Sequence, residues 1–222
     1  MTILLATNNS HKVREILQII PDVTVRTPGD LGISFHHEET GTSFAENARG
    51  KAEALWRELQ KLPTASRQHI DAVLADDSGI CVDALEGRPG IYSARYGADN
   101  PVSPATTDSA RNQLLLSEME DCSTRSARYV CAVAALRGPH RELCISDTLE
   151  GEIAAAPSDG SGGFGYDPIF YLPELGCTAA DITAEQKHAI SHRGKAIRQA
   201  IAALRTSLQA AAVSTPTKGH NS

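Results

Sequence analysis

The sequence predicts an α/β protein, and three observations support that class. A short apolar run at residues 1–6 is followed by a polar loop and then by a helical pattern with apolar residues on one face. Residues 43–59 carry a second apolar stripe at helical spacing. Residues 127–136 place Tyr129, Cys131 and Val133 on one face, turn at Gly138, and return over 143–149, which is typical of a β-hairpin.

Composition narrows the function classes. The chain has 222 residues, 41% of them apolar, and a net charge of -6, so the protein as a whole is not a nucleic-acid-binding surface. Its five cysteines are an odd number without a Cys-x-x-Cys pair, which argues against a zinc site or a disulfide scaffold and fits a reducing compartment. No signal peptide or membrane-spanning stretch is evident. We therefore expect a cytoplasmic protein with neither nucleic-acid nor membrane partners.

Two adjacent carboxylates mark the first candidate site. Residues 72–75 are predicted to form a buried strand, followed by Asp76, Asp77, Ser78 and Gly79. Carboxylates at the end of a buried strand suit Mg²⁺, which takes oxygen ligands and shares its coordination with substrate phosphates. All four residues also favour turns. This stretch alone therefore leaves a metal site and a plain turn open.

The polar loop from Thr7 to Lys12 is the second candidate. It joins the predicted first strand to a helix for which Asn9 or Ser10 is a suitable N-cap. A helix N-terminus after a strand binds phosphate through its free amides and its dipole. Lys12 in the first turn opposes that dipole. A bound phosphate would explain the lysine, although a solvated lysine remains an alternative.

Acidic residues precede the helix predicted at residues 43–59. The run His36-His37-Glu38-Glu39 suggests metal ligands, but no second ligand motif lies nearby, so we expect a solvated loop. Ser43 and Glu46 have the spacing of a capping box. Glu46 is therefore either a helix cap or a metal ligand at the helix start.

The segment Gly160–Gly165 matches G-x-G-x-x-G without the context that this motif requires. A dinucleotide site needs a strand before the motif and a helix after it, whereas here Pro157 precedes it and Pro168 follows. We expect instead a mobile loop that approaches a ligand, with Phe164 and Tyr166 as stacking surfaces.

The last predicted helical region begins at a capping-box spacing, Thr183 to Gln186, and ends near residue 208, with a break near Gly194. It carries the densest basic cluster of this acidic chain: Lys187, His188, His192, Arg193 and Lys195. The cluster indicates either an anionic ligand or a solvated helix face. Residues 209–222 are rich in Ala, Ser, Thr and Pro and are predicted to be a disordered tail, which leaves 1–208 as a single domain.

Five segments resemble, in order, the inosine triphosphate pyrophosphatases, which are also called dITP/XTP pyrophosphatases or Ham1-like enzymes. They are residues 6–12, 42–48, 74–96, 164–170 and 187–196. The resemblance covers residues 3–205. It implies an elongated mixed β-sheet flanked by helices, with two lobes around a central active-site cleft. It also implies Mg²⁺, a homodimer, and hydrolysis of ITP, dITP and XTP to the monophosphate and pyrophosphate.

The resemblance also implies a role for each motif. Asp77 corresponds to the catalytic base and a metal ligand, Glu46 to the second ligand, and Ser78 to a substrate contact. The residues that hold the triphosphate would be Thr7, Asn8, Asn9, Ser10, His11 and Lys12. Those around the nucleobase would be Phe164, Gly165, Tyr166, Asp167, His192 and Arg193, with Lys187 reaching the substrate.

Four features depart from the family pattern, and one of them is the connector at residues 61–71, which is long for the family. His11 stands where glycine is usual, His188 where asparagine is common, and Ala179–Asp181 where an aromatic-Ala-Glu sequence is usual. None of these changes removes a proposed catalytic group. A magnesium-dependent phosphomonoesterase and a non-catalytic nucleotide-binding module remain the alternative functions.

Overall fold

The computed structural model describes residues 1–99, 104–138, 142–160 and 162–213. Its strands are β1 (Thr2–Leu5), β2 (Thr24–Arg26), β3 (Ala72–Val82), β4 (Ser126–Leu136), β5 (Glu142–Ile153), β6 (Phe170–Leu172) and β7 (Cys177–Thr178). They form one seven-stranded sheet in the order β2-β1-β3-β4-β5-β6-β7. β1 is parallel to both of its neighbours and all other pairs are antiparallel, so the predicted mixed sheet is confirmed, as is the β4–β5 hairpin.

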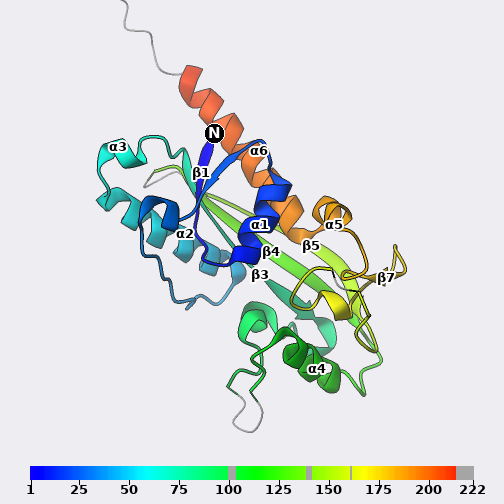
Figure 1. Cartoon of the computed structure of the whole chain (residues 1–222). Coiled ribbons are helices and arrows are strands. Elements are labelled where there is room, and N and C mark those ends of the chain that lie inside the picture. Colours follow the sequence, from blue (N-terminus) through cyan, green and yellow to red (C-terminus); the bar gives the residue numbers. More distant parts are fainter. Residues whose placement is uncertain (100–103, 139–141, 161, 214–222) are drawn as a thin grey trace, which may run out of the picture.

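Helices cover both faces of this long sheet (Figure 1). They are α1 (Ser10–Ile19), α2 (Phe44–Lys61), α3 (Thr64–Arg67), α4 (Asp108–Glu118), α5 (Ala184–Ile190) and α6 (His192–Val213). On β4, Cys131 and Val133 pack with α1 and α6, whereas Ala132 and Ala134 pack with α2. At the far end of the sheet α4 packs on β3, β4 and β6 around Leu115 and Phe170. The central strands are therefore buried on both sides.

β3 is longer than the sequence predicted. We expected a strand over 72–75 that ends before Asp76, with a metal site or a turn at Asp76–Gly79, but β3 pairs with β4 without a break from Val73 to Val82. That prediction was wrong because β4 supplies a partner along the whole stretch and because nearby cations compensate the two carboxylates. Consecutive strand residues point to opposite faces. Asp76 therefore faces α1 and α6, and Asp77 faces α2.

The sheet opens beside these carboxylates because β1 is short. β1 pairs with β3 only as far as Leu5 and Leu74, and the chain then turns into α1. Beyond that point the edge of β3 faces the 3₁₀ segment at residues 90–95. Gly79 permits this approach, since a Cβ there would lie 2.4 Å from both the Gly90 carbonyl oxygen and Ser93 Oγ. The result is a cleft next to the middle of β3.

The C-terminal helices differ from expectation in two details. The predicted capping box of Thr183 and Gln186 is present, but the break between α5 and α6 falls at Ser191 rather than near Gly194. α6 continues to Val213, past residue 208. Residues 214–222 of the predicted tail lie outside the described residues. None of the described helices is long and apolar enough to cross a membrane.

Candidate functional site

The cleft beside β3 contains two chambers. The first, of about 450 Å³, we call the aromatic chamber; it is lined by Asn9, His11, Lys12, Ser78, Gly79, Ser93, Ala94, Asp108, Arg111, Tyr129, Phe164, Gly165, Tyr166, Asp167, Lys187, His192 and Arg193. The second, of about 280 Å³, we call the carboxylate chamber; it is lined by Ala6, Thr7, Asn8, Asn9, Lys12, Phe35, His36, His37, Glu39, Lys51, Asp77, Ser78, Ile91 and Ala94. Asn9, Lys12, Ser78 and Ala94 belong to both lists, so the chambers adjoin.

Asp76 is a buried anion held between two cations. Its Oδ2 lies 2.9 Å from Lys12 Nζ and 3.2 Å from Arg193 Nε, and the residue is 1% exposed. Burial alone would raise the pKa of Asp76, but Lys12 and Arg193 outweigh that effect and hold the pKa well below its usual range. Asp76 therefore stays ionised and fixes both cations at the aromatic chamber.

Asp77 has the opposite electrostatic character. Its Oδ1 lies 2.8 Å from Lys51 Nζ, and its Oδ2 accepts from Asn47 Nδ2 at 3.2 Å. Burial raises the pKa of Asp77, and Lys51 offsets that rise only in part. Neighbouring carboxylates whose pKa values are pushed apart are typical of acid–base sites, where the one with the higher pKa exchanges protons.

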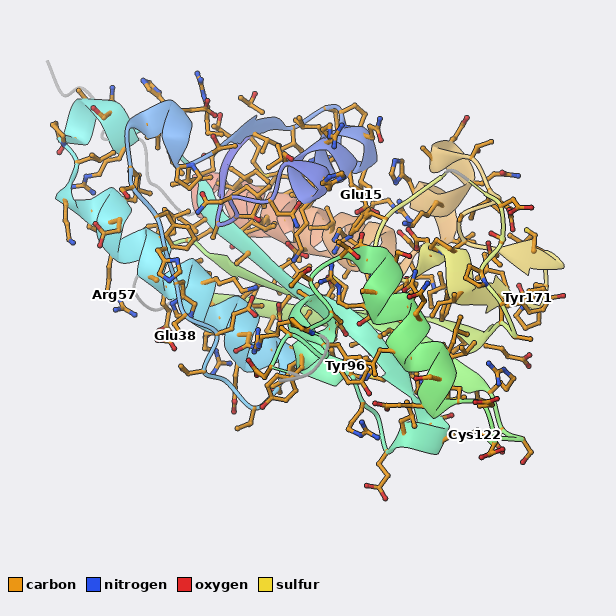
Figure 2. The ribbon with its side chains drawn as sticks, turned by 60° about the horizontal axis from the view of Figure 1, so that its bottom comes forward. Glu15, Glu38, Arg57, Tyr96, Cys122 and Tyr171 are labelled. Carbon is orange, nitrogen blue, oxygen red and sulfur yellow. The ribbon has the colours of Figure 1, made fainter. Side chains whose placement is uncertain are left out.

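The guanidinium group of Arg193 makes polar contacts that hold the side chain in place. Nη1 donates to Glu15 of α1 and Nη2 donates to Ser78 Oγ at 2.6 Å, in addition to the contact of Nε with Asp76. Glu15 reaches this position from the buried side of α1 (Figure 2). Since Arg193 is 3% exposed and every arm of its fork is engaged, it forms a rigid part of the wall.

Phe164 supplies a ring to the aromatic chamber and contacts three other lining side chains. Its ring centroid lies 4.9 Å from Lys187 Nζ, 5.8 Å from Arg193 Cζ and 5.7 Å from the His11 ring. In the same lining, the His192 ring stacks on Tyr129 with centroids 4.7 Å apart. Burial lowers the pKa of His192 far below its usual value, so this imidazole is neutral at physiological pH. The chamber thus combines ring surfaces with hydrogen-bond donors.

Asp167 fixes the loop that carries Phe164. Its Oδ2 accepts from the Phe164 amide at 2.7 Å and from Lys187 Nζ, and its Oδ1 accepts from the Tyr129 hydroxyl at 3.2 Å. Asp167 is 1% exposed. Its carboxylate is therefore committed to protein donors.

The structure brings most of the predicted site residues to the cleft, but Ser10 and Glu46 line neither chamber as the described residues form them. The Glu46 carboxylate accepts from the amide and the hydroxyl of Thr42, at 2.7 and 2.8 Å. Hydrogen bonding from the Thr42 amide lowers the pKa of Glu46. The metal-ligand interpretation of Glu46 does not fit this geometry, because the side chain closes the start of α2 instead.

Glu39 and Lys51 are site residues that the sequence did not reveal. Glu39 Oε1 lies 2.6 Å from Lys51 Nζ, so this ammonium group sits between Glu39 and Asp77. The expectation of a solvated loop at residues 36–39 is wrong at Glu39. Lys51 did leave a signal, because it lies on the buried face of α2 next to Ala48 and Ala52. A lysine within an apolar stripe needs a buried partner.

The side chains of the carboxylate chamber can be compared with the ligands that Mg²⁺ prefers. Within the described residues no group of three or more His, Cys, Asp and Glu side chains could hold a metal. Mg²⁺, however, commonly uses one or two carboxylates together with water and substrate phosphates. Glu39 and Asp77 already converge on one cation, Lys51 Nζ. This donor set therefore fits Mg²⁺.

A cationic, carboxylate-lined chamber that adjoins an aromatic one defines a binding cleft for a ligand with an anionic end and a planar end. Comparison with known protein families agrees with such a binding cleft and identifies the family. Residues 3–203 match the Ham1 family, and the chain belongs to that family.

Relatives and solved structures extend the match over nearly the whole chain. The dITP/XTP pyrophosphatase of Treponema denticola is 46% identical over 197 residues, which cover 89% of this chain and 95% of that protein. The dITP/XTP pyrophosphatase of Photorhabdus laumondii is 42% identical, with coverages of 91% and 98%. The Ham1 protein of Coxiella burnetii superposes with a TM-score of 0.78 at 36% identity, and covers 93% of this chain and 99% of its own. The Ham1 protein of Staphylococcus aureus gives 0.75 at 38%, with coverages of 93% and 100%.

Proposed function

We propose that this protein hydrolyses the non-standard purine nucleoside triphosphates ITP, dITP and XTP to the nucleoside monophosphate and pyrophosphate, and so removes them from the nucleotide pool. Its membership of the Ham1 family and the activity named for its relatives support this function. The observation that carries it is Asp77, a carboxylate with a raised pKa that pairs with Lys51 in a chamber also lined by Lys12, next to the aromatic chamber.

The aromatic chamber takes the base. The purine lies against Phe164, with Gly165, Tyr166 and Asp167 around it, and Lys187, His192 and Arg193 supply charge and hydrogen bonds. Because the Asp167 oxygens are already satisfied, donors dominate the polar groups of this chamber. A 6-oxo purine pairs with a donor, whereas the 6-amino group of adenine leaves it unpaired, a mismatch that can discriminate by about 10⁴-fold.

The carboxylate chamber takes the triphosphate. The loop from Thr7 to Lys12 places the N-terminus of α1 at this chamber, and Lys12 and Lys51 add two ammonium groups. Such fixed positive groups stabilise the charge that develops on the leaving pyrophosphate. Ser78, which belongs to both chambers, contacts the substrate between its base and its phosphates.

Asp77 acts as the general base. A water molecule attacks the α-phosphorus and forms a new P–O bond as the bond to the bridging oxygen of the β-phosphate breaks. Asp77 takes the proton of that water, and pyrophosphate leaves with the bridging oxygen. The raised pKa of Asp77 suits this exchange, because a base is most effective when its pKa approaches the working pH.

Glu39 and Asp77 would hold Mg²⁺, with Glu39 in the role that the family resemblance implies for Glu46. Once bound, the ion neutralises charge on the phosphate oxygens. Lys51 pairs with both Glu39 and Asp77 and so keeps the two carboxylates close together. We further propose, from the family resemblance, that the protein is a homodimer and acts in the cytoplasm on purine nucleoside triphosphates.

Product analysis tests the function. The protein is incubated with Mg²⁺ and ITP, dITP, XTP, GTP or ATP, and mono- and diphosphates, pyrophosphate and orthophosphate are separated. We expect monophosphate and pyrophosphate from the first three substrates, with little turnover of GTP and ATP. Orthophosphate as the first product would favour the magnesium-dependent phosphomonoesterase. Binding without any product would favour the non-catalytic nucleotide-binding module.

A further inference from the structure

Helix α4 holds Gly165 at both of its backbone polar groups. The Gly165 N–H donates to Asp108 Oδ2 at 2.8 Å, and the Gly165 carbonyl accepts from Asn112 Nδ2 at 3.1 Å. Asp108 and Asn112 are four residues apart, so they lie one turn apart on the same face of the helix. Two side chains of one helix therefore hydrogen-bond to a single residue of the loop. We call this contact the α4 clamp.

Gly165, the residue held by the clamp, lies between the two residues whose rings line the aromatic chamber. Phe164 and Tyr166 flank Gly165, and all three line that chamber. Gly165 has a φ of +66°, a left-handed conformation that glycine adopts readily and most side chains do not. The Tyr166 hydroxyl donates to the Ser93 carbonyl at 2.8 Å on the inner side of the loop. The clamp is the corresponding support on the outer side.

The helix that carries the clamp is itself anchored. At its C-terminal end Glu118 Oε2 accepts from the Tyr96 hydroxyl at 2.5 Å and from Arg88 Nη1 at 3.1 Å. Tyr96 lies against α4 in Figure 2. Leu115 and Met119 pack the same helix into the core. The clamp therefore acts from a fixed support.

Helix stability does not account for Asn112. The residue is 4% exposed in the middle of α4, where asparagine is a poor helix former and a buried amide is costly unless it is bonded. Its Oδ1 has no hydrogen-bond partner among the described residues, so the bond to Gly165 is what the amide gains. The amide therefore points to a role at the loop.

We propose that Asn112, together with Asp108, is a positioning residue that sets Phe164 and Tyr166 against the purine. The proposal rests on the proposed function, because it assigns the aromatic chamber to the base. Asn112 does not line the chamber, whereas Asp108 does, and both bond to the backbone of Gly165. Loss of the clamp should thus weaken recognition of the base and leave the chemistry at Asp77 intact.

The first test is Asn112→Leu, which removes the amide donor at nearly constant size. We expect the KM for ITP to rise about tenfold and the preference for ITP over GTP to fall, with kcat changed less than about twofold. Gln113→Leu is the matched control. It makes the same amide-to-leucine change one residue later, on the exposed side of α4, and should alter none of these values.

The second test releases the other end of the clamp. Asp108→Ala removes the acceptor for the Gly165 amide and also the ion-pair partner of Arg111. Asp108→Asn loses the ion pair as well but keeps an acceptor oxygen for Gly165, so it should restore most of the ITP affinity if the clamp is what matters. Hydrogen exchange at residues 163–167 should be faster in Asn112→Leu and Asp108→Ala than in the wild type. This measurement needs no turnover, so it tests the clamp independently of the proposed function.

Three outcomes would overturn the proposal. One is faster exchange at Gly165 with an unchanged KM and unchanged ITP preference in both variants. Another is a loss of kcat and of thermal stability without a rise in KM, which indicates a purely structural role. If the wild type turns over no nucleoside triphosphate, the proposed function fails. Equilibrium binding of IMP then decides, and equal affinity of the wild type and Asn112→Leu would overturn the clamp.

Discussion

Asp76 and Asp77 are chemically identical neighbours with different environments. Asp76 meets Lys12 and Arg193 on one face of β3, which holds its pKa down, whereas burial dominates for Asp77 on the other face and raises its pKa. The difference follows from strand geometry, since adjacent side chains point to opposite faces. One residue can therefore stay permanently charged while the next exchanges a proton.

Substitution of Asp77 tests that division of roles. Asp77→Asn keeps the size of the side chain and removes the base, so kcat for ITP should fall by roughly 10²–10⁴-fold while ITP still binds. Steady-state kinetics and equilibrium binding measure the two quantities. Asp83→Asn changes an exposed aspartate that pairs with Arg128 and should have little effect. Unimpaired turnover by Asp77→Asn would refute its assignment as the base.

A pair of glutamates tests the metal assignment. Because Glu39 shares a cation with Asp77 and Glu46 caps α2, Glu39→Gln should raise the Mg²⁺ concentration for half-maximal activity at least about tenfold. Glu46→Gln should leave that concentration nearly unchanged. Mg²⁺ titration of initial rates after treatment with a chelator measures both. The reverse ranking would return the ligand role to Glu46.

His192 should make folding stability depend on pH. Burial lowers its folded pKa far below the ordinary value of 6.5, so below pH 6.5 the unfolded chain binds a proton that the folded protein does not. This contribution to stability is complete above pH 6.5 and is lost as pH falls toward the folded pKa. The slope is about 1.4 kcal/mol per pH unit for one proton.

The control for this pH dependence is His192→Phe, which keeps a ring against Tyr129 and cannot titrate. Urea unfolding between pH 7.5 and about 5 should show a steeper loss of stability in the wild type than in the variant. Other histidines contribute equally to both proteins, so the difference isolates His192. Parallel pH dependences would contradict the buried neutral imidazole.

At the scale of elements, the start of α1 lies at both chambers. Asn9 caps the helix by accepting from the amides of His11 and Lys12, and no acidic residue occupies the first turn. Lys12 extends from that turn to Asp76 and lines both chambers. The unfavourable position of Lys12 relative to the helix dipole thus has a compensating anion in the protein itself.

Loss of this lysine should act on binding. Lys12→Met keeps much of the aliphatic stem and removes the charge, so we expect the KM for ITP to rise roughly tenfold with a smaller change in kcat. Lys61→Met, at the exposed end of α2, is the control. Competition by pyrophosphate should weaken in parallel for Lys12→Met. Unaltered ITP affinity would exclude the phosphate-loop role of Lys12.

Elements were predictable where the local pattern is strong, and the site was predictable where a motif is continuous. Periodicity predicts α2 and the β4–β5 hairpin, because buried faces repeat. The end of β3 was not predictable, since the turn-forming residues Asp76–Gly79 are held in a strand by β4, far along the chain. Glu39 was missed for a similar reason: only the folded loop brings it to Lys51.

At the scale of the whole molecule, the oligomeric state is a prediction. The homodimer rests on the resemblance to the family. Light scattering coupled to size exclusion should give about twice the mass of the single chain if the protein is a homodimer. The mass should not change with dilution over the range used for kinetics. A single-chain mass at all concentrations would remove the homodimer from the proposal.

The uninterrupted pairing of β3 with β4 has one more consequence. A single stiff ladder carries Asp77 in one chamber and Ser78 at the boundary with the other. The separation of these two side chains is therefore set by the paired strand itself. We expect that a ligand which reaches into both chambers must match this spacing, so that its length matters as well as its base and its charge.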